Sequence, residues 1–121
     1  MAIELAFDCP QTRKRLQSGP LSKLLEGFCD WLFNHGFSRP SVRKHLCHVS
    51  HLNEYLGGPT ATIRETLGPK DIDLFFKAYP SRCRNRGSLE RHVHRVWYSV
   101  NRFANYLREA ALLEPLPQQA S

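Results

Sequence analysis

The sequence lacks the features that define several protein classes. No stretch approaches the roughly 18 uninterrupted apolar residues that a membrane-spanning helix requires. There is no Gly-rich phosphate loop of the P-loop or Rossmann type, and no paired carboxylates suggest acid and base catalysis. The N-terminal residues do not combine a basic segment with a long apolar one, so they do not resemble a secretory signal. These absences predict a soluble, cytoplasmic, bacterial or phage protein, and they argue against an enzyme.

The four cysteines, Cys9, Cys29, Cys47 and Cys83, show no C-x-x-C spacing. Two of them fall inside helical patterns, which favours reduced thiols over a disulfide framework.

Possible zinc ligands occur close together at His45, Cys47, His48 and His51. Their spacing matches no closed structural site, because a second ligand pair from another element is missing. The pattern favours solvated or partly packed side chains, and we expect no metal and no cofactor.

The composition is that of one globular domain with an excess of basic residues. The chain has 121 residues, 41% of them hydrophobic, and 17 Lys and Arg against 11 Asp and Glu give a net charge of +6. Seven arginines fall between residues 82 and 108, where Glu90 is the one acidic residue: 82, 84, 86, 91, 95, 102 and 108. Such regional basicity favours a polyanionic partner.

Apolar residues recur every three or four positions in four segments, which is the spacing of one helix face. The predicted helices span residues 21–34, 39–56, 69–79 and 89–111. Gly36 ends the first, the second starts after Ser38 with Pro40 in its first turn, and Ser88 is the N-cap of the fourth. Residues 1–19 lack a sustained period and predict a flexible N-terminal arm. Residues 112–121 predict a linker, which leaves 20–111 as the folded domain.

The last predicted helix has two distinct faces. On a helical wheel with 100° per residue, the apolar residues occupy one arc of about 120°, which predicts the buried side. These residues are Leu89, Val93, Val96, Trp97, Val100, Phe103, Ala104 and Leu107. Arg91, Arg95, Tyr98 and Arg102 are spaced four, three and four apart, so they form one stripe near the opposite side.

Three stretches carry a resemblance to a known family: LLEGFCDWLFNHGFSRPSVRKHLCHVSHLNEYLG, LGPKDIDLFF and SLERHVHRVWYSVNRFANYLREAALLEP. In this order, over about residues 21–117, the chain resembles the N-terminal core-binding domain of tyrosine recombinases, the phage integrase family. The resemblance implies an all-α fold, a compact orthogonal SAM-like bundle of four to five helices.

The resemblance also implies a function in DNA integration and recombination. The bundle would embrace one side of double-stranded DNA, while a separate catalytic domain of the same parent protein, following residues 112–121, carries out the chemistry. Other recombinase protomers on the DNA are further implied partners. His92, Arg95, Tyr98 and Tyr106 then receive no catalytic role, because the family's Arg, His-x-x-Arg and Tyr belong to the second domain.

The candidate DNA contacts combine the stripe with a predicted basic loop. The resemblance adds the outer face of the second predicted helix, with Lys44 and His51, because it implies DNA contacts mainly from the second and fourth helices. Guanidinium groups that share a face, next to the unpaired N–H groups of a helix start, suit phosphate contact. The candidates are Lys44, His51, Arg82, Arg84, Arg86, Arg91, Arg95 and Arg102. Two alternatives stay open: a helical protein-interaction module without DNA binding, and a metal-dependent enzyme.

Overall fold

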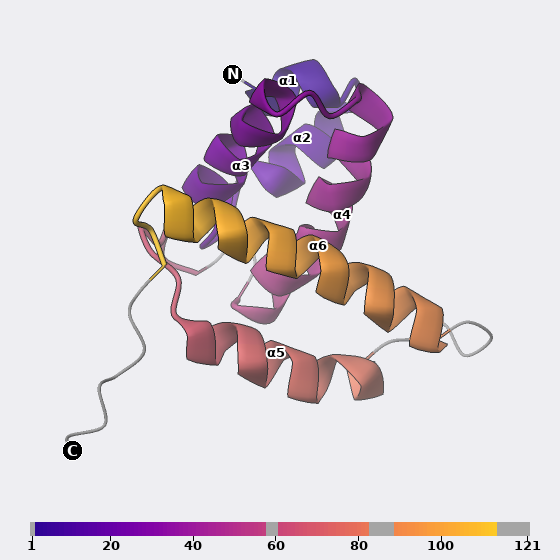
Figure 1. Cartoon of the computed structure of the whole chain (residues 1–121), viewed down its shortest axis with the longest axis vertical. Helices are drawn as coiled ribbons and strands as arrows, with labels where there is room; N and C mark the ends of the chain where they lie inside the picture. The colour runs from indigo at the N-terminus through magenta and orange to yellow at the C-terminus, as the bar shows by residue number, and fades with distance from the viewer. Residues whose placement is uncertain (1, 58–60, 83–88, 114–121) are drawn as a thin grey trace.

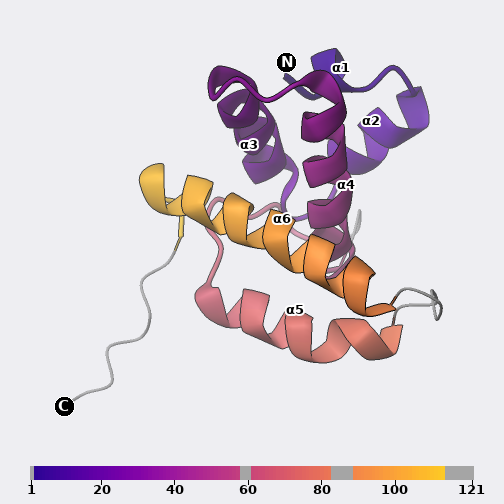
Figure 2. The ribbon, with the colours of Figure 1, turned by 45° about the vertical axis from the view of Figure 1, so that its right-hand side comes forward.

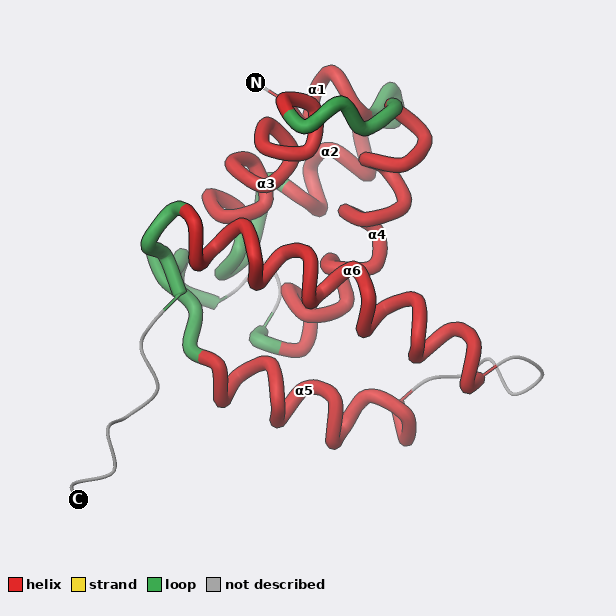
Figure 3. The backbone as a smooth tube through the Cα atoms, viewed as in Figure 1, coloured by secondary structure: helices red, strands yellow, loops and turns green. Residues whose placement is uncertain are grey.

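The computed structural model describes residues 2–57, 61–82 and 89–113, and within these ranges its helices are joined by loops, with one isolated bridge between Leu67 and Leu113 (Figures 1 and 3). The helices are α1 (Ala2–Ala6), α2 (Pro10–Leu16), α3 (Ser22–Asn34), α4 (Arg39–Tyr55), α5 (Pro69–Arg82) and α6 (Leu89–Glu109). The predicted all-α class is confirmed. None of the described helices has the length and apolar character needed to cross a membrane.

The long helices form a crossed arrangement. α6 runs across α4, and α5 lies alongside α6 in both views, on the side away from α1, α2 and α3 (Figures 1 and 2). The most extensive contacts join α4 with α6 and α1 with α3.

The N-terminal segment corrects the expectation of a flexible arm. Residues 2–6 and 10–16 form α1 and α2, and Ile3, Ala6, Phe7 and Leu16 are buried in the core. The carboxylate of Glu26 on α3 accepts hydrogen bonds from the first amides of α1. The bundle therefore has six helices in the described ranges instead of four to five. Helices of five and seven residues are too short to show a periodic apolar pattern, so periodicity could not predict them.

The predicted end of α3 and the predicted start of α4 are confirmed. The side chain of Ser38 accepts a hydrogen bond from the Ser41 amide, and Pro40 lies in the first turn of α4. Gly36 has a φ of 82° and follows α3, while the Phe37 amide donates to the Leu32 carbonyl at 3.1 Å. This is the left-handed helix ending that glycine favours.

Two boundaries differ from the prediction. α5 continues past Pro80 to Arg82, because a proline near the end of a helix removes only one hydrogen bond from the last turn. Leu112 and Leu113 pack against the core, and the Leu67 amide donates to the Leu112 carbonyl at 3.0 Å. The folded domain therefore extends to residue 113, and the rest of the predicted linker lies outside the described residues.

The end of α6 suggests a stabilising substitution. Ala111 has a φ of 59°, and the Leu112 amide donates to the Leu107 carbonyl at 2.7 Å, the same ending that Gly36 gives α3. Because an L-residue is strained in this region, we expect Ala111→Gly to raise the free energy of unfolding by about 0.5–1 kcal/mol in urea denaturation. Gly36→Ala is the reciprocal control, because no atom lies within 4 Å of the added Cβ. We expect it to lower the free energy of unfolding by about 1 kcal/mol, and this loss would come from backbone strain alone. A lower stability for Ala111→Gly would contradict the assigned ending.

Trp97 corrects the predicted phase of α6. Its side chain is 47% exposed and stacks on His94, with ring centroids 5.9 Å apart. The buried arc is shifted away from Trp97 and consists of Val96, Val100, Phe103, Ala104 and Leu107, together with Ser99. Trp97 lies about 100° around the helix from Val96, at the edge of the predicted arc.

Candidate nucleic-acid interface

Exposed basic side chains lie on α4 and on α6, the two helices that cross. Lys44 on α4 and Arg91 and Arg95 on α6 are exposed. Three ion pairs occur in the part of the chain that the structure describes, and none of them includes these side chains. With respect to the described residues, the three cations are therefore available to an external anion.

Contacts across the helix crossing place the α6 stripe next to the turn of α4 that carries Lys44. The ring of Tyr98, in the stripe, stacks on His45 of α4 with centroids 6.4 Å apart. Lys44 is the chain neighbour of His45, and its charge contributes to lowering the pKa of both His45 and His48. Positive charge from both helices thus gathers near their crossing.

Arg102 belongs to the stripe in sequence but lies differently from Arg91 and Arg95. Its guanidinium lies 4.8 Å from the centroid of the Phe37 ring and 5.2 Å from that of Tyr98. It also donates a hydrogen bond of 2.7 Å to the Tyr98 hydroxyl. Two aromatic contacts and one hydrogen bond hold this half-buried side chain against the protein, so we assign Arg102 mainly a structural role.

His51 corrects the expectation that it projects from the outer face of α4. It is half-buried, and its ring centroid lies 5.4 Å from Tyr79 of α5 and 5.7 Å from His92 of α6. His48 is likewise half-buried, with its ring 6.4 Å from His92. The periodicity of α4 does not reveal that α5 and α6 cover this side.

These contacts form a histidine seam, which consists of His45, His48 and His51 of α4, His92 of α6, and the hydroxyls of Ser99 and Tyr79. Ser99 is 1% exposed. Its Oγ lies 2.8 Å from Nδ1 of His45 and 2.9 Å from Nδ1 of His48. The Tyr79 hydroxyl lies 2.6 Å from Nε2 of His92. The seam therefore joins all three long C-terminal helices through side-chain hydrogen bonds.

Burial is the largest influence on the titration of the α4 histidines. Desolvation, together with the smaller effects of the Arg102 and Lys44 charges, lowers the pKa of His45 to about 4. Desolvation likewise lowers the pKa of His48 to about 4, with the neighbouring histidines adding to the effect. The pKa of His51 is also lowered, mainly by burial and by His92. These imidazoles are neutral at neutral pH, so His51 does not serve as a cationic phosphate contact.

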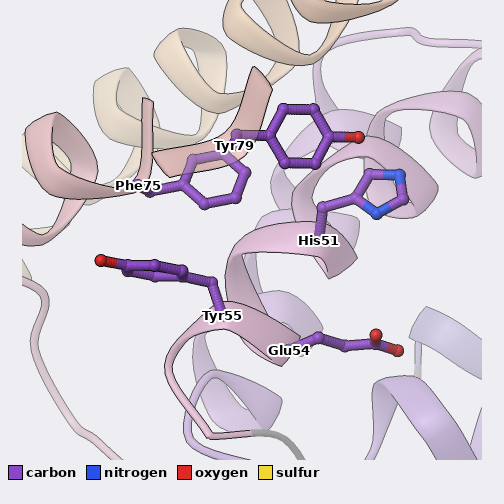
Figure 4. Close-up of a pocket in the computed structure, with 5 residues that line it drawn as sticks. All are labelled: His51, Glu54, Tyr55, Phe75 and Tyr79. Atoms are coloured by element: carbon purple, nitrogen blue, oxygen red, sulfur yellow. The ribbon is translucent and has the colours of Figure 1, made fainter. Parts of the chain in front are cut away.

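A pocket of about 240 Å³ lies at one end of the seam (Figure 4). His51, Glu54 and Tyr55 of α4 line it together with Phe75 and Tyr79 of α5. The rings of Phe75 and Tyr79 pack on one another with centroids 5.0 Å apart, and Phe75 is 1% exposed. Because these aromatic faces are largely covered by protein, the pocket offers little apolar surface for a ligand.

The side chains of three other predicted DNA contacts are not described by the structure. Arg84 and Arg86 lie outside the described residues, as does most of the predicted basic loop. Arg82 ends α5, and the structure does not describe its side chain.

The residues with catalytic or metal-binding chemistry are engaged in the fold. His92 is hydrogen-bonded to the Tyr79 hydroxyl, and Tyr106 packs on Phe28 with ring centroids 5.9 Å apart. Cys9, Cys29 and Cys47 are free thiols, as predicted, while Cys83 lies outside the described residues. In the described ranges, no three His, Cys, Asp or Glu side chains are arranged to hold a metal ion.

Sequence reasoning missed Ser99 and Tyr79, the two hydroxyls of the seam. In the sequence, Ser99 is a polar residue directly before the apolar Val100, and this is the signal that could have indicated a polar contact. The structure shows that Ser99 is buried, where a polar group needs a hydrogen-bond partner.

Comparison with known proteins leaves the chain without an assigned family: no family model, no curated protein and no solved structure matches it.

Proposed function

We propose that this chain is a DNA-binding domain, the core-binding domain of a site-specific tyrosine recombinase, which positions duplex DNA for a separate catalytic domain. The observation that supports it best is the set of exposed cations on two packed helices, Lys44 of α4 and Arg91 and Arg95 of α6, which take part in none of the ion pairs among the described residues. The sequence resemblance adds the specific recombinase role to this general expectation.

The placement of these cations suits a phosphate backbone. Duplex DNA presents a regular array of phosphates, and a domain that neutralises several of them at once releases condensed counterions. Side chains fixed on two packed helices meet such an array with less loss of conformational freedom than side chains on a tail. Tyr98, which is 51% exposed between Arg91 and Arg102 on the stripe, adds a hydroxyl at the same edge.

The salt dependence of DNA binding tests the proposal. We expect a Lys44→Ala, Arg91→Ala, Arg95→Ala triple variant to bind a long duplex more weakly. Because each neutralised phosphate contributes about 0.9 to the slope of log affinity against log salt, that slope should flatten by roughly 2 to 3. Fluorescence anisotropy, begun at low salt, measures both quantities.

A charge-matched control separates the seam from a general effect of net charge. Lys14, Lys70 and Lys77 are exposed on α2 and α5, so their triple alanine variant removes the same formal charge from other helices. Its slope should stay close to that of the parent. Equal slopes for parent and seam variant would remove this face from the DNA interface, and undetectable DNA binding by the parent would reject the proposal itself.

A second candidate function is a helical protein-interaction module, which exposed apolar side chains favour. Leu5 is 69% exposed and Leu74 is 52% exposed, in addition to Trp97. Large apolar groups at the surface can mark protein contacts. This candidate predicts no salt-dependent affinity for DNA.

A further inference from the structure

We propose that the histidine seam is a proton-dependent lock that holds α6 against α4 only while at least one of His45 and His48 is neutral. The lock is a property of the folded domain and does not depend on DNA binding. Its elements are the Ser99 hydroxyl shared by His45 and His48, and the packing of His92 against His48 and His51.

The Ser99 bridge requires at least one imidazole to lack a proton on Nδ1. A serine hydroxyl donates one hydrogen bond and can accept others. Ser99 therefore donates to Nδ1 of one histidine and accepts from Nδ1–H of the other. If both imidazoles are protonated, both Nδ1 atoms are donors, and the hydroxyl hydrogen of a side chain that is 1% exposed loses its acceptor. An unsatisfied buried donor destabilises the fold.

The charges around the bridge oppose protonation from several sides. Lys44 on the same helix and Arg102 on α6 act on His45, while His45, His51 and His92 act on His48. At the other end of the seam, Arg15 of α2 and His92 oppose a charge on His51, whereas Glu54 favours it. α5 contributes Tyr79, a neutral hydroxyl bonded to His92. Among the carboxylates of the described residues, Glu54 is the one that favours a charge on these α4 histidines, so protonating both His45 and His48 places like charges together inside the interface.

The direction of the pH effect follows from the lowered pKa values. His45 and His48 have a pKa of about 4 in the folded protein, against 6.5 for an unperturbed histidine. Between these values the unfolded chain binds more protons than the folded one, so stability increases with pH. The contribution is complete above pH 6.5 and is lost progressively as the pH falls towards 4.

Urea unfolding followed by circular dichroism between pH 7.5 and 4.5 tests the lock. The slope of the free energy of unfolding against pH gives the number of protons taken up on unfolding. In the parent, His45 and His48 together should contribute about two protons near pH 5. In a His45→Asn, His48→Asn variant, uptake near pH 5 should be lower by that amount. Asparagine suits this test because its amide reproduces the position of Nδ1 and does not titrate.

His94→Asn is the matched control, because His94 stacks on Trp97 at the exposed face of α6, outside the seam. This variant measures how much of the change in the double variant comes from losing an imidazole on the surface of α6. If the double asparagine variant takes up as many protons on unfolding near pH 5 as the parent does, the proposed lock is rejected.

A titration of the unmodified protein keeps the proposal testable if the double variant fails to fold. We expect the NMR resonances of the His45 and His48 rings to shift only below about pH 5, as their lowered pKa values require. Titration midpoints close to 6.5 for both rings would overturn the lock.

Discussion

Replacing Phe103 with alanine is expected to lower the free energy of unfolding by about 3–5 kcal/mol, as measured by urea or thermal denaturation. Phe103 is fully buried, and its ring meets that of Phe28 at an interplanar angle of 64° with centroids 5.1 Å apart. Such an edge-to-face pair adds about 0.5–1.5 kcal/mol beyond the burial of its area. Because a small domain has a total stability of about 5–15 kcal/mol, the variant should be close to unfolding.

Trp97→Ala is the matched control on the same helix. Trp97 is the larger side chain, but it is 47% exposed, and its ring contact is with His94 of its own helix. We expect this substitution to change the free energy of unfolding by less than about 1 kcal/mol. A loss for Trp97→Ala that equals the loss for Phe103→Ala would show that α6 has a different phase from the one in the structure.

The sequence predicted the long helices well because their signals are local. The Ser38 cap depends on residues within one turn, as does the glycine ending of α3, and both could be read without tertiary structure. The apolar stripe of α4, at Val42, Leu46, Val49 and Leu52, is buried as expected. Local periodicity is therefore sufficient for helices of three or more turns.

Contacts between helices could not be predicted from the same information. Asn53 is 2% exposed, accepts a hydrogen bond from the Leu21 amide at 2.9 Å, and donates one to the Ser18 carbonyl at 3.1 Å. On a helical wheel it is merely a polar residue beside an apolar stripe. Its role depends on where the start of α3 passes over α4, which is a tertiary property.

The candidate site shows the same division. A wheel correctly groups Arg91, Arg95, Tyr98 and Arg102 on one side of α6, but it does not show that Phe37, from the segment before α4, lies under the guanidinium of Arg102. Likewise, the polar side of α4 contains both the exposed Lys44 and the half-buried His51. Which polar residues are exposed depends on the crossing of α4 with α5 and α6, so a single helix could not separate DNA contacts from packing residues.

α1 provides the second large expected effect, because its burial overturns the predicted flexible arm. We expect Ile3→Ala to lower the free energy of unfolding by about 2–5 kcal/mol. Ile3 is fully buried in the hydrophobic core, and α1 packs extensively against α3. Truncating Ile3 leaves a cavity that such a short helix can close only by moving as a whole. Urea denaturation followed by circular dichroism measures the loss.

Leu5→Ala controls for the helix itself. Leu5 lies two residues away on α1 and is 69% exposed, so its truncation removes little buried area, and alanine does not weaken the helix. Its effect should stay within about 0.5 kcal/mol of the parent. A flexible arm would tolerate both substitutions equally, because neither side chain would then be buried in the folded state. A clear difference between two apolar residues of one five-residue helix therefore identifies α1 as part of the core.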